Sequence, residues 1–392
     1  MSMSIAGMAT ANPDHVLTQE DALELAQQIF AGEEQARTLK VIYRRSGIKT
    51  RRTVVGTNLV RQWLGLPRPG EAESGGSSLA DSRLPDYGAL GSSFDSTTAV
   101  APPPAPAMNR GATTQERMRL YIARAPELAA RAAADALVRA EMHPQEITHL
   151  VTVSCSGLMS PGIDIELIRR LGLPATTQRT HVGYMACHGS LNGLRVAKSY
   201  TGEDLQARVL LCAVELCSLH YYSQWDPTRL MANVIFGDGA AALVGRASHD
   251  ETEWRHVASG SCVIPDSLDV LQHNVCDHGF EVVLSARLPE LIQQHLRPWL
   301  GSWLRAHDLS LEKIGSWAIH PGGPRVVSAV EEALGLPASA TAISREVLGE
   351  YGNMSSATVL FILERLRRTD APRPCAALAF GPGLTAEVAL FV

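Results

Sequence analysis

The sequence lacks a long apolar run, a metal-ligand motif and a strong excess of either charge. Its 392 residues carry a formal net charge of -5, and such a mild balance does not favour a general nucleic-acid binder. No stretch approaches the roughly 18 apolar residues of a membrane span, so we predict none. The first residues contain no basic segment followed by an apolar one, so we expect no secretory signal.

Cysteine is sparse and unpaired in the sequence. No C-x-x-C, H-E-x-x-H or paired Cys/His cluster occurs, so we expect no metal site. An odd number of cysteines without an export signal favours reduced thiols in the cytoplasm. The seven cysteines stand at positions 155, 187, 212, 217, 262, 276 and 375.

The order of apolar and amphipathic segments predicts a layered α/β protein with buried sheet strands. We divide it into an N-terminal half (1–240) that carries Cys187 and a C-terminal half (241–392) that carries His320 and Asn353. Residues of about 65–111 contain seven of the 22 prolines and many glycines and serines. This composition predicts a long surface insertion in the first half.

Helix boundaries are visible in two places. Thr18 is a plausible N-cap for the amphipathic segment 18–30. Thr113 and Glu116 have the spacing of a capping box. The alanine-rich segment that follows is expected to continue as helix, with Pro126 near a first turn.

The stretch "GYMACHGSLNG" places Cys187 between a predicted strand and a predicted helix. At a helix N-terminus, unpaired N–H groups and a nearby imidazolium would lower the thiol pKa and favour a nucleophilic thiolate. The alternative is a small buried apolar residue, which is the usual fate of a free cysteine. We prefer that alternative for Cys155, Cys212 and Cys217, and the nucleophile for Cys187.

Two further side chains, those of His320 and Asn353, are candidates to act with Cys187 in catalysis. In "SWAIHPGGP" an apolar strand delivers His320 to a glycine-rich loop, and such loops often carry function. Asn353 in "EYGNMSSA" precedes a helix, where it could be an N-cap. An amide beside an imidazole can also donate to a developing oxyanion. His188 is a poorer partner for Cys187, because successive helical residues point about 100° apart.

Several motifs occur in a recognisable order. They are "ATANP" with Gln19, "GYMACHGSLNGLRVA", "VIFGDGAAALVG", "WAIHPGGPRV", "EYGNMSSATVLFIL" and "FGPGLTAE". With these motifs the chain resembles the type III polyketide synthases, the chalcone synthase-like branch of the thiolase superfamily, and especially bacterial members.

The resemblance implies a five-layer αβαβα thiolase fold of two similar halves, assembled as a homodimer. It implies that Cys187, His320 and Asn353 are catalytic and that Phe236 lies between the CoA tunnel and the cavity. The implied reaction is decarboxylative condensation of malonyl-CoA onto an acyl starter on Cys187. Cyclisation to a pyrone, a resorcinol or another polyphenol follows, and no metal or prosthetic group is required.

The resemblance also implies binding residues. The densest basic run, from Lys40 to Arg52, resembles the CoA entrance, although a charge run is more often a solvated face. The expected CoA-binding residues are Lys40, Arg44, Arg45 and Arg325. The expected cavity residues, besides Phe236, are Cys155, Ser156, His273, Val282, Ser355, Gly381 and Gly383.

Two alternatives remain open at this point. One is a condensing enzyme like 3-oxoacyl-carrier-protein synthase III, which also uses Cys, His and Asn. The other is a non-catalytic acyl-CoA-binding homologue. Fold alone would not separate these interpretations.

Overall fold

The computed structural model describes residues 2–30, 32–64, 66 and 111–392. The predicted insertion of about 65–111 therefore lies outside the described residues, except for residues 66 and 111. The helices are α1 (Gln19–Ile29), α2 (Glu33–Arg45), α3 (Thr57–Trp63), α4 (Thr114–Arg139), α5 (Ile163–Leu171), α6 (Gly189–Glu203), α7 (Pro227–Ile235), α8 (Leu288–Arg305), α9 (Pro324–Leu334), α10 (Ala342–Tyr351) and α11 (Thr358–Arg368).

The strands form one large sheet and two small ones. They are β1 (Met3–Ala11), β2 (Val16–Thr18), β3 (Thr50–Arg52), β4 (His149–Ser154), β5 (Gln178–Gly183), β6 (Arg208–Leu216), β7 (Asp238–Ala247), β8 (Arg255–Val263), β9 (Leu271–Cys276), β10 (Gly279–Leu284), β11 (Ser316–Ile319), β12 (Cys375–Gly381) and β13 (Thr385–Phe391). The large sheet has the order β11-β12-β13-β8-β1-β7-β6-β4-β5. Its outer pairs β4–β5, β4–β6 and β11–β12 are parallel, whereas the central pairs are antiparallel.

The sheet is buried on both faces. In β6 the odd-numbered residues from Val209 to Ala213 pack with α6 and α11, and the even-numbered residues from Leu210 to Leu216 pack with α4. In β12 the odd-numbered residues from Cys375 to Ala379 join the core around α6 and α11, and the even-numbered ones face α8 and α9. This alternation is the two-residue period of a strand.

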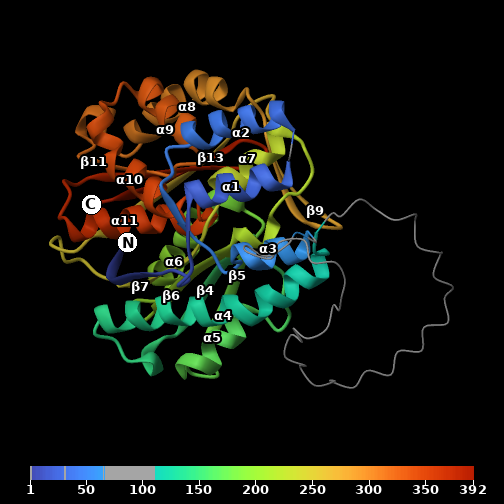
Figure 1. Cartoon of the computed structure of the whole chain (residues 1–392). Helices are drawn as coiled ribbons and strands as arrows, with labels where there is room; N and C mark the ends of the chain where they lie inside the picture. The colour runs from blue at the N-terminus through green and yellow to red at the C-terminus, as the bar shows by residue number, and fades with distance from the viewer. Residues whose placement is uncertain (1, 31, 65, 67–110) are drawn as a thin grey trace.

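These contacts give five layers. Helices α6 and α11 lie in the middle and are covered by strands of both halves. Helices α4 and α5 lie on one outer side, and α8 and α9 lie on the opposite side, as Figure 1 shows. The predicted αβαβα arrangement is confirmed.

Helix α4 confirms one local prediction and corrects another. The Thr113 side chain accepts from Glu116 N–H, and the Glu116 carboxylate accepts from Thr113 N–H, which completes the capping box. Pro126, however, lies inside the helix and not in a first turn. A proline there removes one intrahelical hydrogen bond, but this proline is buried in the core against the sheet.

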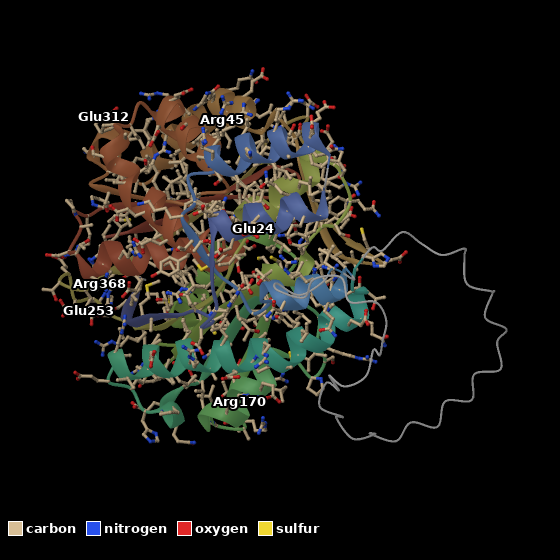
Figure 2. The ribbon with its side chains drawn as sticks, in the orientation of Figure 1. Glu24, Arg45, Arg170, Glu253, Glu312 and Arg368 are labelled. Carbon is tan, nitrogen blue, oxygen red and sulfur yellow. The ribbon has the colours of Figure 1, made fainter. Side chains whose placement is uncertain are left out.

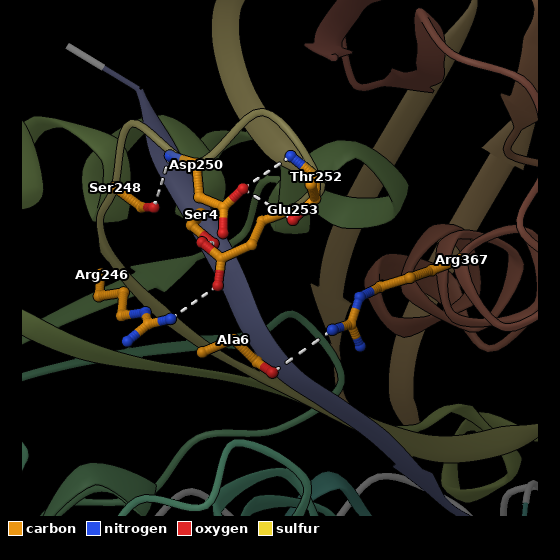
Figure 3. A network of polar contacts seen from close by, with 8 residues as sticks. All are labelled: Ser4, Ala6, Arg246, Ser248, Asp250, Thr252, Glu253 and Arg367. Carbon is orange, nitrogen blue, oxygen red and sulfur yellow. Dashed lines mark hydrogen bonds and ion pairs between the residues drawn. The ribbon is translucent and has the colours of Figure 1, made fainter.

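The two halves are joined by the connection 248–254 between β7 and β8. The Glu253 carboxylate accepts hydrogen bonds from Ser4 of β1 and Arg246 of β7, both at 2.6 Å. Arg367 of α11 reaches the carbonyl of Ala6 in the same region (Figure 3). The division after residue 240 stays a prediction, and that residue lies within β7.

Candidate active site

Cys187, His320 and Asn353 line a single cavity, although they come from both halves of the chain. Cys187 follows β5, His320 follows β11, and Asn353 follows α10. The structure therefore brings together the three side chains that the sequence singled out.

Cys187 lies in a 3₁₀ turn (Ala186–His188) that leads into α6. The preceding backbone is strained, because Tyr184 and Ala186 have φ values of 58° and 48°. Such conformations in residues other than glycine are uncommon and concentrate at functional sites. Gly189 lets the turn approach the sheet, since a Cβ there would lie 2.9 Å from Cγ1 of Val153.

The electrostatics of Cys187 differ from the sequence-based expectation. Burial raises the pKa of Cys187 to about 11, although hydrogen bonds from Ser355 and Asn353 oppose the rise. The expected lowering of the pKa was therefore wrong for the protein without a ligand. Desolvation outweighs the hydrogen bonds that favour the thiolate, because a thiolate loses its hydration when it is buried.

His320 is held by a main-chain hydrogen bond, and its ring makes none with the described residues. Its N–H donates to the carbonyl of Leu378 at 2.8 Å. Neither ring nitrogen has a hydrogen-bond partner in the part of the chain that the structure describes. Burial lowers the pKa of His320 to about 3, and His188 adds to this effect. The resting pair is thus a thiol and a neutral imidazole.

Asn353 is fixed through both its main chain and its side chain. Its N–H donates to the carbonyl of Ile235 at 2.7 Å, and its carbonyl accepts from Gly237 N–H at 3.0 Å. The Oδ1 atom accepts from Ser355 N–H at 2.8 Å, which directs Nδ2 toward Sγ of Cys187 at 3.9 Å. The N-cap of the turn that follows is Met354, so Asn353 is not that cap.

Most of the expected cavity residues do line the cavity. They are Phe236, Cys155, Ser156, His273, Val282 and Ser355. Gly381 and Gly383 are not among its lining residues, and the adjacent Phe380 is. A Cβ on Gly381 would lie 2.1 Å from Cδ2 of His188, and Gly383 has a φ of 67° in a turn. We attribute a structural role to both glycines.

Sequence reasoning missed Glu215 at the end of β6. This carboxylate is fully buried and accepts hydrogen bonds from the N–H groups of Cys155 and Ser156, and from the Ser156 hydroxyl at 2.6 Å. Burial raises its pKa, and these hydrogen bonds oppose the rise. The only signal in the sequence was one acidic residue in the apolar run "RVLLCAVEL".

The expected CoA-binding residues Lys40, Arg44, Arg45 and Arg325 are exposed, and none of them lines the cavity. Arg45 lies at the periphery of the molecule (Figure 2). By contrast, Arg51 from the same basic run is 3% exposed and does line the cavity. The basic run is therefore exposed to solvent only in part, because Arg51 is buried.

Across residues 2–30, 32–64, 66 and 111–392, no group of three or more His, Cys, Asp and Glu side chains is placed to hold a metal ion. Nor does any helix within those ranges have the length and apolar character needed to cross a membrane.

Comparison with known protein families gives two adjacent matches. The N-terminal domain of chalcone and stilbene synthases matches residues 101–248, and the C-terminal domain of the same family matches residues 256–392.

Individual relatives agree. The chain is 29% identical over 399 residues to the alpha-pyrone synthesis polyketide synthase-like Pks18 of Mycobacterium tuberculosis, covering 99% of this chain and 90% of that protein. It is 36% identical over 270 residues to 1,3,6,8-tetrahydroxynaphthalene synthase of Streptomyces peucetius subsp. caesius, covering 67% and 72%.

Solved structures show the same relationship. PKS-I from the brown alga Ectocarpus siliculosus matches with a TM-score of 0.85 and 29% identity, covering 100% of this chain and 98% of that one. The C-terminal type III polyketide synthase domain of Steely1 from Dictyostelium has a TM-score of 0.82 at 23% identity, covering 100% and 99%, which supports the fold.

Proposed function

This chain belongs to the chalcone and stilbene synthase family and is a type III polyketide synthase, and on that premise we propose that Cys187, His320 and Asn353 carry out its chemistry. The observation that supports this most is their convergence on one cavity from both halves, with Asn353 Nδ2 at 3.9 Å from Cys187 Sγ.

In the first step Cys187 takes the acyl group of a starter CoA thioester. The Sγ proton moves to the neutral imidazole of His320, and the thiolate attacks the thioester carbonyl. CoA leaves as its thiol, taking that proton, and the acyl group remains on Cys187. Because burial holds the pKa of Cys187 near 11 and that of His320 near 3, we expect this proton to move only when substrate is bound.

In the second step malonyl-CoA loses CO₂ and becomes an enolate. We assign the stabilisation of the enolate oxygen to the ring N–H of His320 and the side-chain amide N–H of Asn353, as in an oxyanion hole. The carbanion attacks the Cys187 thioester, which lengthens the acyl chain by two carbons and releases the thiolate. The lengthened chain, now a CoA thioester, is transferred back to Cys187 with release of CoA, and the cycle repeats. Ring closure then gives a pyrone, a resorcinol or another polyphenol.

The exposed residues Lys40, Arg44, Arg45 and Arg325 are candidates to contact CoA phosphates at the protein surface. Phe236 and the other cavity residues enclose the growing chain, and two copies of the chain form a homodimer. We place the enzyme in the cytoplasm.

The test is incubation of the purified protein with malonyl-CoA, alone and with a panel of acyl-CoAs, read by mass spectrometry. We expect CoA, CO₂ and a cyclised product from the natural chain and no product from Cys187→Ala. Cys262→Ser is the matched control, because this half-buried cysteine lies in β8. Full product from Cys187→Ala would contradict Cys187 as the acyl carrier.

A further inference from the structure

The lining of the cavity carries polar atoms that the proposed reaction does not use. Arg51, Thr53 and Tyr221 all line the cavity. The Arg51 Nε, Thr53 Oγ1 and Tyr221 hydroxyl are buried, and none has a hydrogen-bond partner among the described residues. Buried polar atoms in proteins are usually hydrogen-bonded, so exceptions among the lining residues of one cavity require an explanation.

Arg51 is a buried cation without a paired carboxylate in the described ranges. Its Nη1 donates to the main-chain carbonyls of Asn233 and Phe236. The Asp238 carboxylate lies within electrostatic range but already accepts from the N–H groups of Val54 and Ser218, both at 2.7 Å. An unpaired buried charge is costly unless something compensates it.

Tyr221 completes the group as a hydrogen-bond donor. Burial raises its pKa, while Arg51 and the Asn233 side chain oppose the rise. The Asn233 side chain also binds the main chain of Tyr222. Its Oδ1 accepts from Tyr222 N–H at 2.8 Å, and its Nδ2 donates to Tyr222 O at 2.6 Å. The Tyr221 hydroxyl therefore stays protonated, and it lies within electrostatic range of Arg51.

The catalytic candidate His320 shows the same combination of features. Its ring nitrogens are also buried, unengaged by any described residue, and at the cavity. Leu17, the strand partner of Arg51, also lines the cavity, as do the apolar residues Leu25 and Val55. In such surroundings a charged hydrogen bond is stronger than in water.

We propose that Arg51, Thr53 and Tyr221 form a polar subsite that binds an anionic or enolic oxygen of the acyl group, beyond its thioester carbonyl. The proposal rests on the proposed function, because it takes the acyl group to occupy this cavity. A guanidinium with two hydroxyl groups suits a carboxylate or an enolate oxygen. That oxygen comes either from a carboxylate at the far end of a starter or from a β-keto group of the growing chain.

The carboxylate of malonyl-CoA is a poor candidate for this subsite. Decarboxylation moves its negative charge onto the enolate, so an arginine bound to the carboxylate would stabilise the ground state more than the transition state. The subsite therefore favours an oxygen that remains on the acyl chain throughout condensation.

Two substitutions test the subsite without breaking a visible contact. Thr53→Val and Tyr221→Phe each remove only the hydroxyl, which has no partner among the described residues. A purely structural role predicts unchanged or higher stability, because a buried unsatisfied group disappears. Arg51 is left in place because it holds the main chain of Asn233 and Phe236.

Binding is measured by calorimetry in the Cys187→Ala background, where no acyl transfer occurs. The probes are glutaryl-CoA, acetoacetyl-CoA, hexanoyl-CoA and malonyl-CoA. We expect Thr53→Val and Tyr221→Phe each to weaken binding of glutaryl-CoA, acetoacetyl-CoA or both by about tenfold. Hexanoyl-CoA and malonyl-CoA should bind as before. Loss with glutaryl-CoA alone identifies a starter carboxylate, and loss with acetoacetyl-CoA alone identifies a keto oxygen.

Where the thioesters bind, three outcomes would overturn the subsite. They are equal losses for all four thioesters, no loss for any, and a loss confined to malonyl-CoA. Turnover of malonyl-CoA by the protein with Cys187 intact is measured in parallel. If turnover is absent while the selective losses persist, the subsite stands and the proposed function fails. If no thioester binds at all, both fail.

Discussion

The amide of Asn353 is aimed at Cys187, because Ser355 N–H holds the amide oxygen at 2.8 Å and leaves Nδ2 at 3.9 Å from Sγ. Ser355 itself has a φ of 46°, so the anchor is a strained residue. The Asn353 main chain is bonded on both sides to the segment around Phe236. The donor is therefore preorganised, which is what oxyanion stabilisation requires.

We predict that Asn353→Ala lowers the rate of malonyl decarboxylation and condensation by about 10²–10³-fold, since one oxyanion donor is lost. Transfer of a starter to Cys187 should persist. Radiolabelled acyl-CoA followed by protein mass spectrometry measures acylation, and CO₂ release measures decarboxylation.

Asn353→Asp is the matched control for shape. It keeps an oxygen for Ser355 N–H but replaces the donor with a second acceptor, so it should be at least as slow as Asn353→Ala. Normal CO₂ release by either variant would remove Asn353 from the proposed chemistry.

Local patterns in the sequence anticipated much of the fold. Thr18 accepts from Asp21 N–H, as an N-cap does, and the Thr113–Glu116 capping box is present. The apolar runs that contain β6 and β12 became strands buried on both faces. These predictions succeeded because caps and periodicity depend on near neighbours.

Features set by long-range packing were not visible. Arg51 stands in a basic run that indicates a solvated face, but the fold buries it, and its Nη1 donates to Phe236 O. The packing is close, because a Cβ on Gly352 would lie 2.9 Å from Cγ of Arg51. The pKa of Cys187 was predicted with the wrong sign, because burial depends on every surrounding element. A local sequence pattern predicts neither the desolvation of a side chain nor its contacts with distant segments.

The hairpin β9–β10 is attached to the first turn of α4 through one residue, Thr114. Thr114 N–H donates to Asp277 O at 2.8 Å, its hydroxyl donates to Cys276 O, and the hydroxyl accepts from Gly279 N–H at 2.7 Å. The same hairpin supplies His273, Phe280 and Val282 to the cavity wall. Thr114 thus positions part of the cavity without lining it.

We predict that Thr114→Val destabilises the protein by about 1 kcal/mol and changes the ratio of products of different chain length. The hairpin loses the two hydrogen bonds of the Thr114 hydroxyl, while Cys187, His320 and Asn353 remain. Product ratios from one starter, read by mass spectrometry, are the measurement. Thr369→Val is the control, because that hydroxyl bonds only to carbonyls of its own helix. An unchanged ratio in Thr114→Val would contradict a role in positioning.

The connection between the halves offers a stability test. Glu253 joins Ser4 and Arg246, and interactions with both oppose the effect of burial and hold its pKa below the usual range. We predict that Glu253→Gln lowers the free energy of unfolding by about 1–3 kcal/mol, since hydrogen bonds to a charged group are weakened. Activity per folded molecule should not change. Denaturant unfolding and a turnover assay measure the two, and equal stability would contradict the assignment.

Acid should destabilise the protein through its buried histidines. Burial lowers the pKa values of His220, His256 and His320 to about 3, against 6.5 for the exposed group. The unfolded chain therefore binds protons below pH 6.5 that the folded chain does not, so stability is lost as the pH falls from 7 toward 3. Each histidine contributes roughly 2 kcal/mol of this loss by pH 5.

His256 isolates the effect, because it does not line the cavity. Its Nε2 donates to Ala258 O at 3.0 Å and lies 2.9 Å from the Ser259 hydroxyl. His256→Gln keeps a donor but removes the titrating ring. We predict that this variant loses roughly 2 kcal/mol less than the natural chain between pH 7 and pH 5. Denaturant unfolding at each pH measures the difference. Parallel curves would mean that His256 charges equally in both states, which its burial argues against because a buried imidazolium would lose its hydration.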